Sequence, residues 1–197
     1  MSDPPVRRRL TRDARRAELL RAGEGLFSER PFEEVSIDDI AAAAGISKNL
    51  LYHYFASKRE LFLAVISDAA ERMLAATEPD LSLPPMERLR GSLAGHLDFA
   101  CEHAQGYVAL MRGAGDEEVA AILARGRDHV VARTIASLPG RLGAAQLELT
   151  LYGWVGLVDA LTLRWVEHRD LPREEVLDLL VALFVSVLST ASAASGD

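Results

Sequence analysis

The sequence predicts an all-α fold of about nine helices, in which a three-helix head at the N-terminus precedes a C-terminal helical bundle. Apolar residues recur every three or four positions along most of the 197 residues, and no segment has the two-residue period of a β-strand. The chain is rich in alanine and leucine, and only 6% of its residues are aromatic, a composition that favours helices. Clusters of proline, glycine and serine separate the periodic segments, as expected for turns between helices.

Residues 36–58, SIDDIAAAAGISKNLLYHYFASK, predict two short helices joined by a tight turn. Ser36 is a favourable N-cap for the first helix. Gly45 is expected to end that helix, because glycine readily adopts the left-handed backbone conformation that a sharp turn requires. Ser47 is expected to cap the second helix, over residues 48–54. This order of elements is a helix-turn-helix, whose second helix enters the major groove of DNA.

The second helix of this unit has polar side chains at the positions expected to face outward. These are Lys48, Asn49, Tyr52 and His53, whereas Leu50, Leu51 and Phe55 are expected to face inward. Lysine contacts phosphate or a guanine edge, asparagine bonds adenine bidentately, and tyrosine and histidine donate to phosphate or stack on sugar and thymine. The alternative is a plain helical hairpin whose polar face is solvated.

Residues 41–62, AAAAGISKNLLYHYFASKRELF, resemble the signature of TetR-type transcriptional repressors. The resemblance covers residues 15–66 and includes Leu20, Phe27 and Phe32. It implies a DNA-binding head, dimerisation through the last helices, and a small-molecule site in the body. A dimeric helix-turn-helix protein matches the two half-sites of a palindromic operator.

The head departs from the family pattern at two places. Pro31 stands where the family usually has glycine, which changes a turn. Asn49 and Leu50 replace a common Gly-Thr or Gly-Ala pair, so Asn49 adds a base-reading side chain that many relatives lack. Lys58 opens the next helix, whose N-terminal amides can hold a phosphate. The predicted DNA contacts are Arg7, Arg8, Arg9, Ser36, Ser47, Lys48, Asn49, Tyr52, His53 and Lys58.

The net charge of −7 argues against a nucleic-acid partner until its distribution is considered. From residue 61 onward there are 11 basic and 19 acidic residues, which leaves a net charge of +1 on residues 1–60. Residues 1–10 are expected to form a disordered basic arm, because their prolines and arginines have nothing to bury. This arm is either a solvated tail or a segment that contacts phosphates or the adjacent minor groove.

The proline-containing stretch after residue 78 marks the predicted boundary between head and body. The predicted limits are 11–56 for the DNA-binding domain, 57–78 for a connecting helix, and 84–192 for a ligand-binding and dimerisation domain. Within them, helices are expected at 11–29, 57–77, 84–103, 104–112, 116–138, 142–169 and 173–191 in addition to the helix-turn-helix.

The last two predicted helices carry more apolar surface than one chain is expected to bury. We therefore expect a homodimer that pairs these helices through Leu151, Val158, Leu161, Trp165, Leu180, Phe184 and Val187. A second face of small residues contains Leu149, Gly153, Gly156, Ala160 and Leu163. The alternative is that both helices are buried within a single bundle.

The body also contains polar and aromatic side chains among apolar ones, a combination typical of ligand cavities. The candidates for ligand binding are His96, Phe99, His103, Tyr107, Met111, Tyr152, Trp154 and Asp159. Each of them could instead belong to the core or an interface. Asp159 stands in a nearly uncharged helix and needs a partner if it is buried. The composition suggests a mostly apolar ligand with one or two polar groups.

These observations favour a dimeric transcriptional regulator, a repressor that a small molecule releases from a palindromic operator. The alternative is an architectural DNA-binding protein whose body is fully packed. An enzyme using His96, His103 and Asp159 is the third hypothesis. It is opposed by the lack of a nucleophile elbow, a phosphate-binding glycine loop or an HExxH motif.

No cofactor or metal site is indicated, because Cys101 is the only cysteine and the two histidines lie two helical turns apart. The arginine-rich N-terminus lacks the apolar core of a signal peptide. The uncharged segment at 179–196 is too short and too polar to span a membrane. We expect a soluble cytoplasmic protein that is associated with the nucleoid when bound to DNA.

Overall fold

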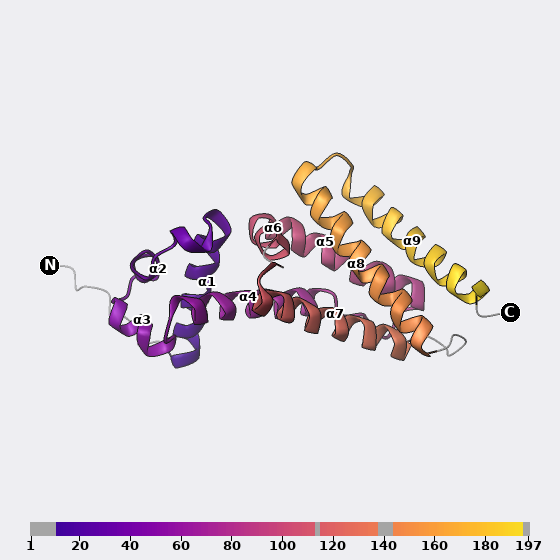
Figure 1. Cartoon of the computed structure of the whole chain (residues 1–197). Coiled ribbons are helices and arrows are strands. Elements are labelled where there is room, and N and C mark those ends of the chain that lie inside the picture. The colour runs from indigo at the N-terminus through magenta and orange to yellow at the C-terminus, as the bar shows by residue number, and fades with distance from the viewer. Residues whose placement is uncertain (1–10, 113–114, 138–143, 195–197) are drawn as a thin grey trace. The chain divides into compact units, whose positions relative to one another are not determined.

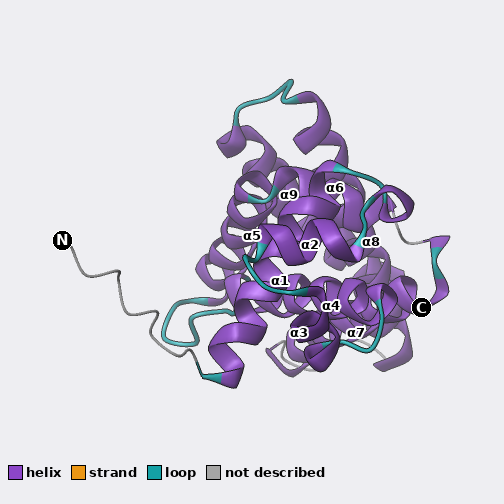
Figure 2. Ribbon diagram, turned by 90° about the vertical axis from the view of Figure 1, so that its left-hand side faces the viewer, coloured by secondary structure: helices purple, strands orange, loops and turns teal. Residues whose placement is uncertain are grey.

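The computed structural model describes residues 11–112, 115–137 and 144–194. Within these residues the chain forms nine α-helices, one short 3-10 helix and no strand (Figure 2). The all-α prediction is therefore confirmed. The predicted contacts at Arg7, Arg8 and Arg9 lie outside the described residues. The elements are α1 Arg12–Glu29, η1 Phe32–Glu34, α2 Ile37–Ala43, α3 Lys48–Tyr54, α4 Lys58–Ala76, α5 Pro85–Glu102, α6 Ala104–Arg112, α7 Glu117–Ser137, α8 Ala144–His168 and α9 Arg173–Ala194.

The chain divides into two compact units at Val65 and Ile66, inside α4. Leu61 and Val65 belong to the core of the first unit, and the second half of α4 belongs to the second unit. The predicted connecting helix at 57–78 thus contributes to both units.

Side-chain caps set the helix boundaries of the first unit. The Thr11 hydroxyl accepts a hydrogen bond from the Ala14 amide at 3.2 Å at the start of α1. Ser36 and Asp39 form a reciprocal capping box at α2. Gly45 follows α2 with a φ of +64°, as its position in the sequence predicted. The core of this unit consists of Leu19, Leu20, Phe27, Val35, Ile37, Ile40, Ala41, Leu51, Phe55, Leu61 and Val65.

The second unit is built around α8, which contacts α5, α6, α7 and α9. Helices α8 and α9 run side by side in opposite directions after a short turn (Figure 1). The Trp165 Nε1–H donates to the Leu171 carbonyl at 2.8 Å and so fixes this turn. No helix in the described part of the chain is long and apolar enough to cross a membrane.

Five of the seven predicted dimer contacts are buried within the single chain, which argues against a role for them in a dimer interface. Leu151, Val158, Trp165, Leu180 and Phe184 are between 0% and 6% exposed within the single chain. The heptad-like stripe of α8 is covered by neighbouring helices of the same chain, so these side chains have no surface left for a partner. Leu161 and Val187 are partly buried against the same core.

A different surface of these two helices is exposed. On α8 it contains Leu149, Tyr152, Gly153 and Ala160, and on α9 it contains Leu179, Ala182 and Val185. We call this surface the outer face of α8 and α9. The α8 part largely matches the small-residue face identified in the sequence.

Candidate functional site

The outward surface of α3 carries all four side chains that the sequence assigned to base and backbone contact. Lys48, Asn49, Tyr52 and His53 are exposed, whereas Leu51 is fully buried. Tyr52 is 44% exposed although it is a large aromatic residue. These four side chains are therefore on the surface, where a ligand as large as DNA can reach them.

Leu50 was predicted to face inward, and this is wrong: its side chain is 39% exposed. Helix α3 has only seven residues, and its inward surface is taken up by Leu51 and the following Phe55. Leu50 thus adds an apolar contact to the exposed surface, of the kind that packs against a thymine methyl.

A carboxylate fixes the position of the Lys48 ammonium. Its Nζ lies 2.8 Å from Asp38 Oδ2, a contact that joins the first turns of α2 and α3. The hydrogen bond and charge of Asp38 raise the pKa of Lys48, which keeps the ammonium protonated. Asp38 also places a negative charge beside the surface that would meet phosphate.

The two predicted serine contacts are helix caps. Ser36 Oγ accepts from the Asp39 amide at 3.0 Å, and Ser47 Oγ accepts from the Leu50 amide at 3.3 Å. In both cases the hydroxyl oxygen is used as an acceptor, so the hydroxyl hydrogen can still donate to a phosphate.

Lys58 has an internal role that the sequence did not indicate. Its Nζ donates to the carbonyls of Phe32 at 2.7 Å and Val35 at 3.0 Å, and it lies 4.2 Å from the centre of the Phe32 ring. These contacts hold the turn between α1 and α2 against the start of α4. The ammonium is thus already bound in the absence of DNA.

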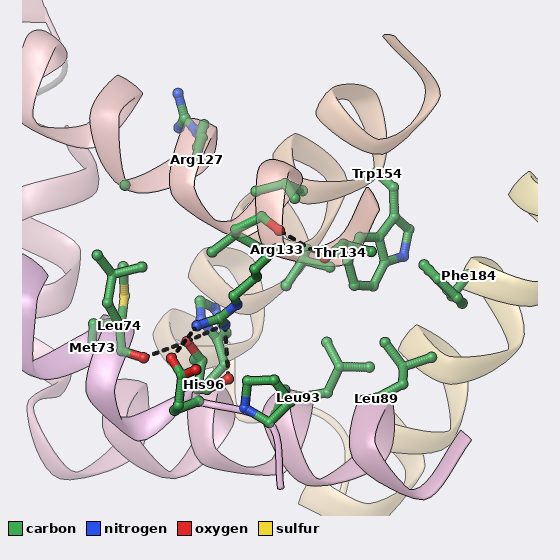
Figure 3. Close-up of a pocket in the computed structure, with 18 of the residues that line it drawn as sticks. Met73, Leu74, Leu89, Leu93, His96, Arg127, Arg133, Thr134, Trp154 and Phe184 are labelled. Carbon is green, nitrogen blue, oxygen red and sulfur yellow. Dashed lines mark hydrogen bonds and ion pairs between the residues drawn. The ribbon is translucent and has the colours of Figure 1, made fainter. Parts of the chain in front are cut away.

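The second unit contains a cavity of about 650 Å³ between α4, α5, α7, α8 and α9, with one residue from α6 (Figure 3). This volume lies within the range of about 300–1,000 Å³ that is usual for small-molecule sites. Its walls are mostly apolar. Figure 3 shows Leu89, Leu93 and His96 along α5, with Trp154 and Phe184 together at one end.

Four of the eight predicted ligand residues line this cavity, namely His96, Met111, Trp154 and Asp159. The other four are not among its lining residues. Tyr107 is only 1% exposed and lies behind His96, with its hydroxyl 3.3 Å from His96 Nε2. Phe99 packs against His103, and Tyr152 belongs to the outer face of α8 and α9.

Three arginines that the sequence reasoning missed also line the cavity. Arg127 Nε donates to Asp159 Oδ2 at 2.9 Å and is the partner that Asp159 was predicted to need. Arg133 donates to the Thr77 carbonyl at 2.7 Å, to its hydroxyl at 2.8 Å, and to Glu78 at 3.0 Å (dashed lines in Figure 3). The third is Arg88. Arg127 and Arg133 could have been found in the sequence, because each is three residues from Val130 and therefore lies on the same inward stripe of α7.

His96 is held uncharged by its surroundings. Burial lowers its pKa from the ordinary value of 6.5, and the carboxylate of Asp159 opposes this effect only partly. Burial likewise raises the pKa of Tyr107, which stays a neutral hydroxyl. The cavity therefore presents His96 as a neutral hydrogen-bonding group near pH 7.

We expect acid to destabilise the protein through His96. Below about pH 6.5 the unfolded chain protonates this imidazole while the folded chain does not, so stability falls as the pH falls, by at most about 1.4 kcal/mol per pH unit. Urea denaturation at pH 7 and pH 5 should show that the free energy of unfolding falls less between these two pH values in His96→Gln than in the wild type. Equal losses in the two proteins would contradict this assignment.

Among the described residues, no three histidine, cysteine, aspartate or glutamate side chains are grouped so that they could hold a metal ion. The side chains that line the cavity of the second unit offer hydrogen bonding, ion pairing and apolar contact. This arrangement is suited to binding a ligand.

Two family models match this chain, one over most of the first unit and one within the second. Residues 19–65 match the family described as bacterial regulatory proteins, tetR family, and residues 85–187 match the tetracyclin repressor-like C-terminal domain. The crystal structure of a tetR-family transcriptional regulator from Streptomyces coelicolor is 33% identical, with a TM-score of 0.83. The alignment covers 93% of this chain and 84% of that one.

Two curated regulators are also similar. The transcriptional activator FasR of Mycolicibacterium smegmatis is 37% identical over 101 residues, which is 50% of this chain and 46% of FasR. The chain thus spans about half the length of that relative. The transcriptional regulator EthR of Mycobacterium tuberculosis is 28% identical over 188 residues, which is 88% of this chain and 87% of EthR. Taken together, the two family matches and the shared fold show that this chain belongs to the TetR family of bacterial transcriptional regulators.

Proposed function

We propose that the protein is a dimeric repressor that binds a palindromic operator through α3 and is released by a small molecule bound in the second unit. One observation carries this proposal: the chain combines an exposed base-reading surface on α3 with a separate cavity of about 650 Å³. An architectural DNA-binding protein needs no such cavity. Acting at the nucleoid, a regulator of this kind would be cytoplasmic.

Helix α4 is the element through which the two sites would communicate. It begins in the first unit, and its last turn lies at the cavity, where Arg133 holds the carbonyl and hydroxyl of Thr77. A ligand that alters these contacts would shift α4, and with it the spacing of the two heads in a dimer. The free energy of operator binding would then become less favourable, at most by the difference between the ligand's binding free energies for the DNA-binding and the released conformation.

The outer face of α8 and α9 is the surface that would join two copies. A Cβ placed on Gly153 or Gly156 meets no atom within 4 Å, so packing inside the chain does not require glycine there. Glycines at such positions allow a second helix to approach closely. Exposed Leu149, Leu179 and Val185 supply apolar surface around them.

Val185→Arg is expected to convert the dimer into a monomer, because a guanidinium would be buried without a partner at the interface. The fold should be unaffected, since Val185 is 45% exposed in the single chain. Sedimentation velocity checks the mass. Leu171→Arg is the matched control, because Leu171 is 44% exposed and lies in the turn between the two helices. A Val185→Arg protein that still sediments as a dimer would contradict this interface.

The proposal is tested by combining thermal stability with DNA affinity. Compounds that raise the melting temperature of the purified protein should be titrated into its complex with an operator fragment. We expect at least one of them to weaken the complex. Stabilising compounds that leave DNA affinity unchanged would support the architectural alternative, and compounds that strengthen binding would indicate an activator or co-repressor mechanism.

A further inference from the structure

Within the described residues, Arg88 is the one charged side chain lining the cavity that has no counterion. It lies near the start of α5 and lines the cavity, and its Nε is buried without a hydrogen-bond partner. No ion pair or hydrogen bond joins its guanidinium to another residue in the described parts of the chain. The nearby Arg90 differs, because it pairs with Asp178 at 2.6 Å and Glu174 at 3.2 Å and is not a lining residue.

The remaining charges of the cavity balance in pairs. Among the described residues, its lining contains three arginines and two carboxylates. Arg127 pairs with Asp159 at 2.9 Å, and Arg133 pairs with Glu78 at 3.0 Å. One positive charge, that of Arg88, is left over. A partly buried cation without an anion is unfavourable, so this site is prepared for a negatively charged group.

A second donor in the wall is also without a partner. Trp154 is 6% exposed, and its Nε1–H makes no hydrogen bond to any described residue. Buried indole N–H groups usually have an acceptor. Arg88 and Trp154 are thus lining residues that each have an unused donor, whereas the carboxylates of Asp159 and Glu78 are paired with arginines.

The shape and polarity of the cavity indicate a long apolar ligand. The α7 residues that line it recur every three or four positions from Ile122 to Ser137, a distance of about 22 Å along the helix. Leu81 and Met86 are lining residues that are 73% and 46% exposed, so the cavity is open to solvent where these two side chains line it. The deeper wall includes buried Leu93 and Val158.

We propose that the cavity binds a single-chain amphipathic anion, an alkyl chain that ends in a carboxylate or a phosphate. The anionic head pairs with Arg88, and the alkyl chain lies along the inward stripe of α7. The inference rests on the proposed function in that this ligand would be the effector. It can be tested without DNA, so its failure would not affect the DNA-binding assignment.

The test is calorimetric titration of the full chain with decanoate, decyl phosphate, decanol and decylamine, each below its critical micelle concentration. We expect at least one anion to bind about 10- to 100-fold more tightly than decanol, as a charge-assisted hydrogen bond to arginine provides. Decylamine should bind most weakly. The comparison of decanoate with decyl phosphate identifies the preferred head group.

Arg88→Gln should reduce the affinity for the preferred anion to that for decanol and leave the affinity for decanol unchanged. Arg90→Gln, two positions away on the same helix, should change neither. The proposal is overturned if decanol or decylamine binds as tightly as the anions, if Arg88→Gln retains the preference for an anion, or if the folded protein binds none of the four.

Discussion

Tyr52→Ala and Lys48→Ala are each expected to weaken operator binding by about 1–3 kcal/mol, the usual cost of losing one side-chain contact to DNA. Both side chains are exposed on α3, so neither change should affect folding or the oligomeric state. Fluorescence anisotropy with a labelled operator checks the affinity. Arg164→Ala is the control, because it removes an exposed cation from the second unit.

The two variants should differ in their response to salt. Lys48 carries the charge, so Lys48→Ala should also lower the salt dependence of binding, by about one unit of slope if it contacts a phosphate. Asp38→Asn should instead strengthen operator binding, because it frees the ammonium of Lys48 and removes a negative charge from beside the DNA. Wild-type affinity in both alanine variants would show that α3 is not the recognition helix.

Gly95→Ala is expected to destabilise the second unit by about 3 kcal/mol or more, at the upper end of the usual cost of overpacking. A Cβ on Gly95 would lie 2.0 Å from the carbonyl oxygen of Ala76 and 3.0 Å from its carbon. Both atoms are backbone at the end of α4, so the two helices would have to move apart. For a chain of 197 residues this corresponds to a fall in melting temperature of about 6–12 °C.

Gly91→Ala provides the matched control on the same helix. A Cβ on Gly91 meets no atom within 4 Å, so the change only exchanges glycine for a better helix former and should stabilise the protein by up to about 1 kcal/mol. Thermal denaturation followed by circular dichroism measures both. Equal melting temperatures for the two variants would contradict the close approach of α5 to α4.

The helices could be predicted from sequence because their signals are local. Ser36 and Ser47 cap the helices that their positions indicated, and Gly45 has the left-handed conformation that a tight turn requires. Each of these depends on a few neighbouring residues. The exposed polar surface of α3 follows from the same helical periodicity.

Local signals could not predict which side chains lie in the core, in the cavity or on the outer face, because this depends on which helices pack together. The apolar stripe of α8 favoured a dimer interface over burial in a single bundle, whereas Leu151 and Trp165 are in the core. Tyr107 had the character of a ligand residue but lies behind His96. Arg88 was missed because an arginine near the start of a helix is usually solvated.

The most direct test of the account is a footprint of the purified full-length protein on the DNA flanking its own gene, at near-physiological salt. We expect the protein to protect a palindrome whose half-sites lie one helical turn or a small multiple apart. Tyr52→Ala should lose that protection. Protection without symmetry or sequence preference would contradict a dimeric operator-specific repressor. So would protection that Tyr52→Ala retains in full.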